Sequence, residues 1–239
     1  MGSVLASTIF TEVSGVLYDT SAVHWTDAEK LRFLNAGQRQ LVLFKPDAYA
    51  INDEYKLAAG TIQSIPDGSA AFTNAAAATL VEGIQFIKLT RNMGIAGLVA
   101  GDAIPVVDMT MMDSAYPGWH AETATAAVQN YMFDERDPKH FYVYPANTGT
   151  GYVEAVYSGL PAAVATTATA ITLSDVYQHA LTDYVLFRCY GKDAALSPYN
   201  AERAVFYWNQ FVEGIGRMDM AKKMESPNLK QPNPSPSRE

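Results

Sequence analysis

The chain has 239 residues, of which 49% are apolar and 18% are charged. This length is compatible with one large domain or two small ones, and an average soluble domain carries about a quarter charged residues. The net charge of -8 disfavours tight nucleic-acid binding, because such binding needs a positive field that displaces phosphate counterions. A surface this poor in charge indicates that partner proteins cover part of it, although a compact acidic monomer is an alternative interpretation.

Two helices are predicted near the N-terminal end. The first covers residues 4–18 and ends at a turn-prone Asp-Thr-Ser sequence. The second begins at Thr26, because Thr26 and Glu29 match a capping box, in which each side chain satisfies a free backbone N–H group of the other residue. Apolar residues then recur at helical spacing until Lys45-Pro46 ends the helix.

The middle of the chain is predicted to be rich in β-strands. Short apolar runs between about Lys56 and Ala165 alternate with Gly, Pro, Asn and Asp, which is typical of strands and turns. The alanine-rich run 73–80 fits a helical turn or a loop equally well. Turn sequences separate the three clearest strands and predict an antiparallel meander of residues 128–133, 141–144 and 152–157.

Helical spacing returns after the β-rich segment. Ser174 is a plausible N-cap for one helix, and Ser197-Pro198 fits the start of a last helix. Gly214 and Gly216 each cost about 1 kcal/mol relative to alanine in a helix, so we expect an end or a bend there. The apolar stripe of the last helix is predicted to be Ala201, Ala204, Val205, Trp208, Val212 and Ile215.

These elements predict an α+β fold. Residues 1–55 and 170–224 form a helical bundle, and residues 56–169 form an inserted antiparallel β-rich domain. Residues 225–239 form an extended C-terminal tail, because four prolines forbid a regular helix and a single leucine cannot build a core.

The sequence predicts no catalytic, cofactor or metal site. Phosphate-binding and dinucleotide-binding fingerprints do not occur, and Cys189 lies in an apolar run where it fits a buried thiol. Asp134, Glu135 and Asp137 precede a proline and fit a turn. One alternative function is that of an enzyme whose catalytic residues are dispersed along the sequence. The histidines lack the spacing of metal ligands; they are His24, His120, His140 and His179.

The sequence also predicts a chain without a membrane partner. No run approaches the roughly 18 apolar residues that a membrane helix needs. The N-terminus lacks the basic stretch and apolar core of a signal peptide. We therefore expect a soluble protein that is not exported.

Several segments, in order along residues 25–215, resemble the head-to-tail adaptor proteins of tailed bacteriophages, also called connector or neck proteins. Cys189 and Gly191 depart from the expected pattern, which affects only local helix packing. The matching segments are 25–29 (WTDAE), 34–39 (LNAGQR), 45–48 (KPDA), 91–94 (RNMG), 117–120 (PGWH), 133–138 (FDERDP), 141–145 (FYVYP) and 190–194 (YGKDA).

The resemblance implies a structural virion protein without catalytic residues or cofactors. Such proteins form a ring, commonly of twelve subunits, beneath the portal at the neck between capsid and tail, after assembly in the bacterial cytoplasm. The implied partners are the portal protein, a tail or nozzle protein and further copies of the chain, while DNA passes through the channel without specific binding.

The C-terminal tail is implied to bind the portal. An alternative is a carbohydrate- or receptor-binding tail module, which the aromatic residues Tyr142 and Tyr144 would support. Because contacts used once in an ordered assembly are often weak alone, we expect the isolated protein to be monomeric. The tail residues expected to contact the portal are Met224, Pro227, Leu229, Lys230, Pro232, Pro234 and Arg238.

Overall fold

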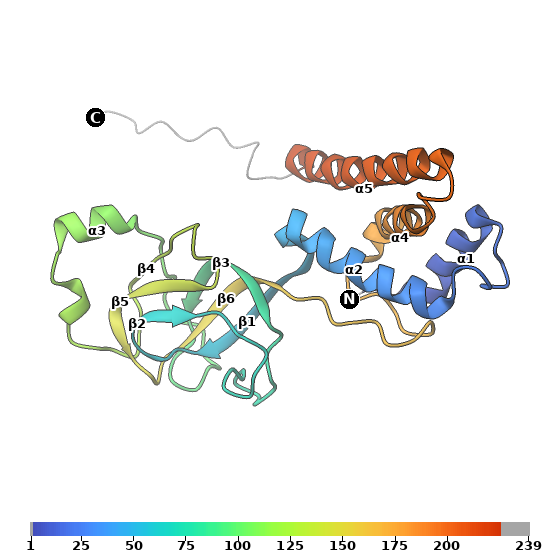
Figure 1. The fold of residues 1–239 in the computed structure, drawn as a ribbon. Helices are drawn as coiled ribbons and strands as arrows, with labels where there is room; N and C mark the ends of the chain where they lie inside the picture. The colour runs from blue at the N-terminus through green and yellow to red at the C-terminus, as the bar shows by residue number, and fades with distance from the viewer. Residues whose placement is uncertain (1, 226–239) are drawn as a thin grey trace. The chain divides into compact units, whose positions relative to one another are not determined.

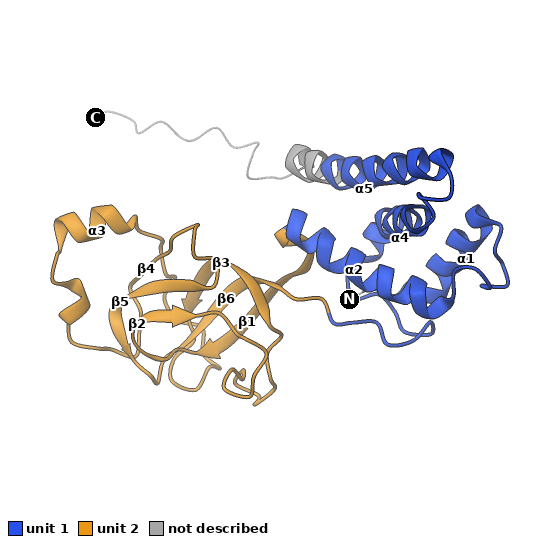
Figure 2. Cartoon of the chain, in the orientation of Figure 1, with its two compact units in different colours: residues 1–45, 162–239 blue, residues 46–161 orange. Residues whose placement is uncertain are grey.

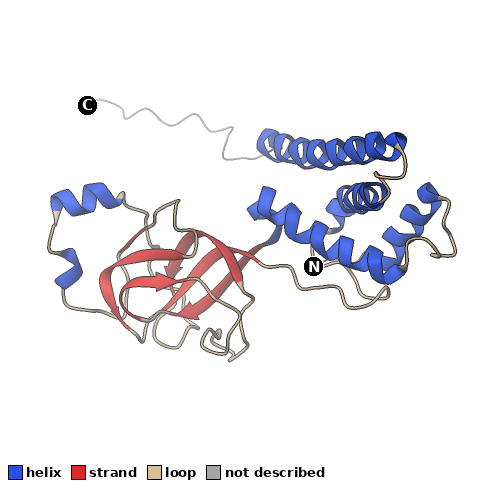
Figure 3. Cartoon of the chain, in the orientation of Figure 1, coloured by secondary structure: helices blue, strands red, loops and turns tan. Residues whose placement is uncertain are grey.

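The structure is a computed structural model that describes residues 2–225, with side chains up to residue 217. The chain divides into two compact units, shown in Figure 2. Residues 1–45 and 162–239 form the helical unit, and residues 46–161 form the β unit. Helices lie at both ends of the chain with the strands between them, which confirms the predicted α+β class (Figure 3).

The unit boundaries differ from the predicted ones by about ten residues at each side. Strand β1 (Ala50–Lys56) pairs with β6 (Tyr152–Gly159), so residues 46–55 belong to the β unit. Residues 162–169 belong to the helical unit. The backbone N–H groups of Ala6 and Ser7 donate to carbonyls of this segment at 3.0 and 2.8 Å. Backbone pairing, which leaves no mark in local composition, sets both boundaries.

The helical unit is centred on one helix. Helix α4 (Gln178–Lys192) packs against the three other long helices, as Figure 1 shows. Gly37 of α2 allows close approach to α4, because a Cβ atom there would lie 2.8 Å from Tyr184 Cδ1. The other helices are α1 (Ala6–Leu17), α2 (Asp27–Phe44), the short η3 (Asp175–Tyr177) and α5 (Pro198–Glu225).

The helices begin near the predicted positions, but only some of the predicted capping hydrogen bonds form. Thr26 accepts a hydrogen bond from the backbone N–H of Glu29 at 3.3 Å, whereas the Glu29 carboxylate accepts from Lys192. Only half of the capping box therefore forms. Ser174 precedes η3 without a side-chain cap, and Ser197 Oγ accepts from the backbone N–H of Tyr199 at 3.3 Å.

We expected the last helix to end or bend at Gly214 and Gly216, and the prediction that it ends there is wrong. Helix α5 continues past both glycines to Glu225. Their weak helix propensity costs about 1 kcal/mol each, which a long hydrogen-bonded helix tolerates. Met224, predicted as the first contact of the tail, consequently belongs to the last turn of α5.

The β unit contains two three-stranded antiparallel sheets. One has the order β1-β6-β3 and the other the order β2-β5-β4. Buried residues of both sheets belong to a single core, in which the rings of Phe86 and Phe141 stack with centroids 4.5 Å apart. The strands not yet bounded are β2 (Ala59–Ser64), β3 (Gly83–Asn92), β4 (Asn130–Met132) and β5 (His140–Thr148).

The predicted three-stranded meander is wrong in its last pairing. Strand β5 pairs with β4 as expected, but β6 lies between β1 and β3 in the other sheet. Alternate residues of β6 are buried, and both of its edges are paired by strands distant in sequence. The glycine-rich turn at 149–151 therefore links two sheets and does not close a hairpin.

The remaining parts of the β unit are connecting segments. The alanine-rich run is a loop, in which Asn74 Oδ1 accepts from the backbone N–H groups of Ala76 and Ala78 at 3.0 Å. Short helices η1 (Pro46–Tyr49), α3 (Met109–Ala115) and η2 (Trp119–Ala121) complete the unit. None of the helices in the described part of the chain combines the length and the hydropathy needed to cross a bilayer.

Candidate functional site

The predicted portal-binding tail is represented by one residue of the described structure. Met224 lies in the backbone of α5, and its side chain is not described. The other six predicted contacts lie outside the described residues; they are Pro227, Leu229, Lys230, Pro232, Pro234 and Arg238. The site that the structure does describe lies further back on α5.

Three helices of the helical unit, α2, α4 and α5, each contain at least four consecutive apolar residues. The run of α4 is 184–187 (YVLF), and the runs of the other two helices include 41–44 (LVLF) in α2 and 205–208 (VFYW) in α5. Successive residues of a helix point about 100° apart, so four in a row cannot all lie on one buried face. Helix α4 buries most of its run because three helices pack around it, whereas some side chains of the α2 and α5 runs face away from the core.

The exposed members of the α2 and α5 runs are large. In α2, Leu41 and Val42 are buried, but Leu43 and Phe44 are 61% and 49% exposed. In α5, Val205 is 60% exposed. An apolar helix face of this kind is a marker of protein contact when it extends beyond the intramolecular core.

The predicted stripe of α5 is thus only partly buried. Ala204 and Ile215 contact the core as expected, and Phe211, which the prediction omitted, is fully buried. Val205 and Val212 lie at the exposed border of the stripe, with Val212 43% exposed. The apolar face of α5 is wider than the contact that α4 makes with it.

The exposed ends of the α2 and α5 runs meet. The Phe44 ring lies 5.9 Å from the Trp208 ring, measured between centroids, and Trp208 also contacts Phe187 at 5.1 Å. Val205, Trp208 and Val212 follow one another at i, i+3 and i+7, which places them on one side of α5. Phe44, Val205, Trp208 and Val212 form what we call the α2/α5 apolar surface.

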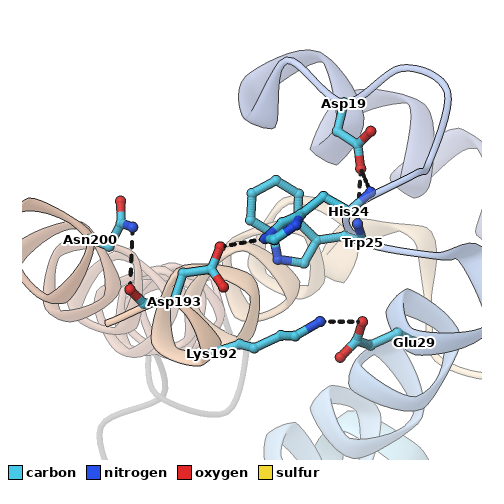
Figure 4. Close-up of polar contacts among 7 residues, drawn as sticks. All are labelled: Asp19, His24, Trp25, Glu29, Lys192, Asp193 and Asn200. Carbon is cyan, nitrogen blue, oxygen red and sulfur yellow. Dashed lines mark hydrogen bonds and ion pairs between the residues drawn. The ribbon is translucent and has the colours of Figure 1, made fainter. Parts of the chain in front are cut away.

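Polar contacts fix the turn that leads into α5. Lys192 Nζ donates to Glu29 Oε2 at 2.8 Å, and His24 Nε2 lies 2.8 Å from Asp193 Oδ2 (Figure 4). Asn200 Nδ2 donates to the Asp193 backbone carbonyl at 3.3 Å. The Lys192–Glu29 pair ties the end of α4 to the start of α2, and the His24–Asp193 contact ties the α4–α5 turn to the loop between α1 and α2, so the start of α5 is held in place.

The loop that receives these contacts is itself organised by one carboxylate. Asp19 accepts hydrogen bonds from the backbone N–H groups of Val23, His24 and Trp25 at 2.9 to 3.0 Å. The N–H group of Trp25 contributes most to lowering the pKa of Asp19. Figure 4 shows Asp19 bonded to the His24 and Trp25 segment. The α2/α5 apolar surface is therefore carried on a well-anchored scaffold.

Comparison with known families decides which proteins this chain is related to. The family model described as SU10 adaptor protein matches residues 5–231. The chain belongs to the SU10 adaptor protein family. A comparison with curated proteins finds no match.

Membership makes this adaptor a phage structural protein and a component of the virion. It confirms the coarse resemblance to adaptor proteins drawn from the sequence. The α2/α5 apolar surface was not predicted as such, although the stripe assigned to α5 included three of its four residues. The sequence contains apolar runs in both helices, but the mostly buried run 184–187 of α4 has the same pattern, so only the structure distinguishes the exposed surface.

The residues considered for chemistry have structural roles in the adaptor. Cys189 is fully buried, and burial raises the pKa of its thiol to about 12. His140 contacts Asp137 at 2.9 Å, and Asp134 accepts from the backbone N–H of Arg136, as expected for turn residues. Within residues 2–225 no group of three or more His, Cys, Asp and Glu side chains is placed to hold a metal ion.

The aromatic strand considered for carbohydrate binding is covered by the adaptor's own side chains. Tyr142 lies 6.2 Å from Trp119 and 6.3 Å from His120, measured between ring centroids. Tyr144 makes an edge contact with Tyr116 at 6.1 Å. Because both tyrosines are half-buried by these rings, they do not form an open stacking platform.

Proposed function

We propose that this protein is a head-to-tail adaptor that forms a ring of twelve subunits beneath the portal. In this role it sits at the neck of the virion, extends the DNA channel and provides the platform on which the tail attaches. It acts by binding other proteins and catalyses no reaction. Membership of the SU10 adaptor protein family supports this function.

The single observation that carries the proposal is the α2/α5 apolar surface. A soluble chain with 18% charged residues leaves Phe44, Val205 and Val212 between 43% and 60% exposed on an anchored helix pair. Large aromatic side chains such as Phe44 and Trp208 are typical of interface centres, and Val205 and Val212 add apolar area beside them. Covering them by a neighbouring subunit or another virion protein would contribute about 25 cal/mol per Å² of apolar area buried.

The proposed partners divide between parts of the chain. The C-terminal tail binds the portal protein, the helical unit contacts neighbouring copies, and another face meets the tail or nozzle protein. DNA passes through the ring without specific binding, for which the net charge of -8 is suitable because it repels phosphates.

The tail assignment is tested by deleting residues 226–239. The core of each unit lies within residues 2–217, so we expect the truncated chain to fold with an unchanged circular dichroism spectrum and melting temperature. We expect it to lose co-sedimentation with portal rings. A variant with residues 226–239 in scrambled order separates sequence-specific docking from mere length.

Undiminished portal binding by the truncated chain would remove the tail from the proposal. Loss of binding by both the truncated and the scrambled chains supports it. If the full-length chain itself never co-sediments with portal rings, the head-to-tail role is wrong.

A further inference from the structure

The two units differ sharply in charge. The β unit contains 13 Asp and Glu residues but only five Lys and Arg residues, which gives it the whole net charge of -8. The helical unit contains 12 residues of each sign and is therefore neutral. A chain built in this way presents an acidic unit to any basic surface on a partner.

Four acidic residues of the β unit line a groove of about 680 Å³ whose lining is partly polar and partly apolar. Val106 and Phe133, which are 57% and 37% exposed, supply apolar surface together with Met109. Carboxylates lie along the same groove, and Arg136 is the one basic residue among its lining side chains. The acidic members are Asp108, Asp113, Asp134 and Glu135, and we call this site the acidic groove.

Local structure accounts for three of the carboxylates but neutralises none. Asp108 caps α3 through the backbone N–H of Met111 at 3.0 Å, Asp113 accepts from Trp119 Nε1 at 2.8 Å, and Asp134 caps its turn. Glu135 makes no hydrogen bond or ion pair with any residue in the described part of the chain. The groove thus retains negative charge that its own surroundings do not offset.

The helical unit carries a matching basic face. Arg32 and Arg39 are exposed on α2 and lie seven residues apart, which places them on one side of the helix about 10 Å from each other. Neither forms an ion pair with a described residue, and the carboxylates near the start of α2 are already bound, Asp27 by Lys30 and Glu29 by Lys192. The exposed Leu43 continues the same side one turn further. We call Arg32 and Arg39 the arginine row.

We propose that the acidic groove of one copy binds the arginine row of a second copy. The groove offers carboxylates beside the apolar side chains of Val106, Met109 and Phe133, and the row offers two guanidinium groups followed by an aliphatic side chain. Arginine side chains form strong charge-assisted hydrogen bonds with carboxylates and pack their stems on apolar surface. Two different faces that meet in this way make a head-to-tail contact, which closes into a ring when the rotation permits.

This contact rests on the proposed ring and names the surfaces that join its subunits. Because it is largely electrostatic, it is weak in the isolated protein and weakens further as salt increases. It does not involve the C-terminal tail, so its test is independent of portal binding.

Charge-reversal complementation provides the test. The groove variant carries Asp108→Asn, Asp134→Asn and Glu135→Arg; the asparagines keep an oxygen that can accept the two capping hydrogen bonds. The row variant carries Arg32→Glu and Arg39→Glu. Each variant shifts the net charge by four, in opposite directions. The control carries Asp67→Asn, Asp102→Asn and Glu54→Arg, which match the groove variant in charge but lie outside the groove lining.

Self-association of the full-length chains is measured by sedimentation velocity up to about 1 mM protein, in about 25 mM and about 500 mM salt. We expect the wild type and the control to associate weakly at low salt. Each variant alone associates at least about tenfold more weakly, because its groove and row then carry the same sign of charge. An equimolar mixture of the two variants restores association, since every groove again meets a row of opposite sign.

The proposal is overturned if the wild type stays monomeric throughout this range, if either variant associates like the wild type, or if the mixture associates no better than each variant alone. Binding of the mixture that is unchanged by salt also overturns it. Failure of the head-to-tail role is a different result, namely a wild-type chain that never binds portal rings.

Discussion

The helical unit is neutral and exposes a cluster of large apolar side chains, whereas the β unit carries the full net charge of -8. The helical unit leaves Phe44, Val205 and Val212 uncovered although each lies beside a packed core. The β unit buries Phe141 and Tyr157 fully but also exposes apolar side chains such as Val106 and Phe133, so the two units differ chiefly in charge. The two units are therefore built for different kinds of contact.

The difference has a physical consequence for assembly. Contacts through the α2/α5 apolar surface depend on apolar burial, which salt weakens little, whereas the proposed contact between the acidic groove and the arginine row depends on charge and is screened by salt. A chain that makes both kinds of contact can bind strongly through apolar burial, while its charged contacts orient the partner. The variants below separate the two contributions.

The largest effect on stability is expected from removing one buried aromatic ring from the core of either unit. Phe141→Ala removes a fully buried ring that stacks on Phe86 and should destabilise the β unit by about 3–5 kcal/mol. Phe211→Ala should have a similar effect on the helical unit, because Phe211 is fully buried against Tyr184. Calorimetry should show that each variant lowers its own unit's melting transition. Equal shifts of all transitions by either variant would contradict separate cores.

The close approach of α2 and α4 gives the next effect. Gly37→Ala places a Cβ atom 2.8 Å from Tyr184 Cδ1 and should cost about 1–3 kcal/mol in the free energy of unfolding. Gly216→Ala is the control, because a Cβ atom there meets nothing within 4 Å and should stabilise α5 by about 1 kcal/mol. Urea denaturation should give opposite signs for the two changes. The same sign for both would mean that helix propensity, not packing, dominates at Gly37.

A smaller effect is expected from a partly buried carboxylate of α4. Burial raises the pKa of Asp183 to about 6, and nearby His179 acts in the opposite direction. The native state then holds this proton more tightly than the unfolded chain, so wild-type stability from this group rises as pH falls from about 6 toward about 4. Asp183→Asn should be more stable than wild type by about 1–2 kcal/mol at pH 7, after allowance for solvent screening.

The pH dependence of that difference is the decisive measurement for Asp183. Denaturant unfolding at several pH values should show the advantage of Asp183→Asn shrinking as pH falls below about 6. A difference that stays constant with pH would show that the side chain acts through packing and not through its charge.

The smallest effect on stability should accompany the largest effect on binding. Val205→Glu with Val212→Glu changes exposed positions of a helix, so the free energy of unfolding should change by less than about 0.5 kcal/mol. Partner binding through the α2/α5 apolar surface should be lost. The matched control is Asn209→Glu with Gln210→Glu, two exposed polar positions of α5. Equal loss of binding in both variants would assign the effect to charge alone.

The helices could be predicted from the sequence because their signals are local. Thr26 and Ser197 mark helix starts, and Lys45-Pro46 marks an end, through contacts within a few residues. The glycines of α5 were overestimated as helix breakers, since hydrogen bonding along 28 residues outweighs two weak positions. Local rules therefore gave the positions of the elements better than their lengths.

The sheet pairing could not be predicted in the same way. Strands β5 and β6 are joined by a short turn yet belong to different sheets, because β6 is paired on both edges by β1 and β3. The acidic groove has the same origin: its lining comes from residues 106–113 and 133–136, which only the fold brings together. Runs 41–44 and 205–208 indicate the α2/α5 apolar surface only in part, because run 184–187 of α4 has the same pattern and is mostly buried among three other helices.

The proposed function is tested most directly by electron microscopy of the purified chain mixed with its portal protein. The account predicts rings of this chain seated on one end of the portal, present with the wild type and absent with Val205→Glu and Val212→Glu together. Micrographs in which the portal remains bare at saturating concentrations of the wild-type chain would contradict it.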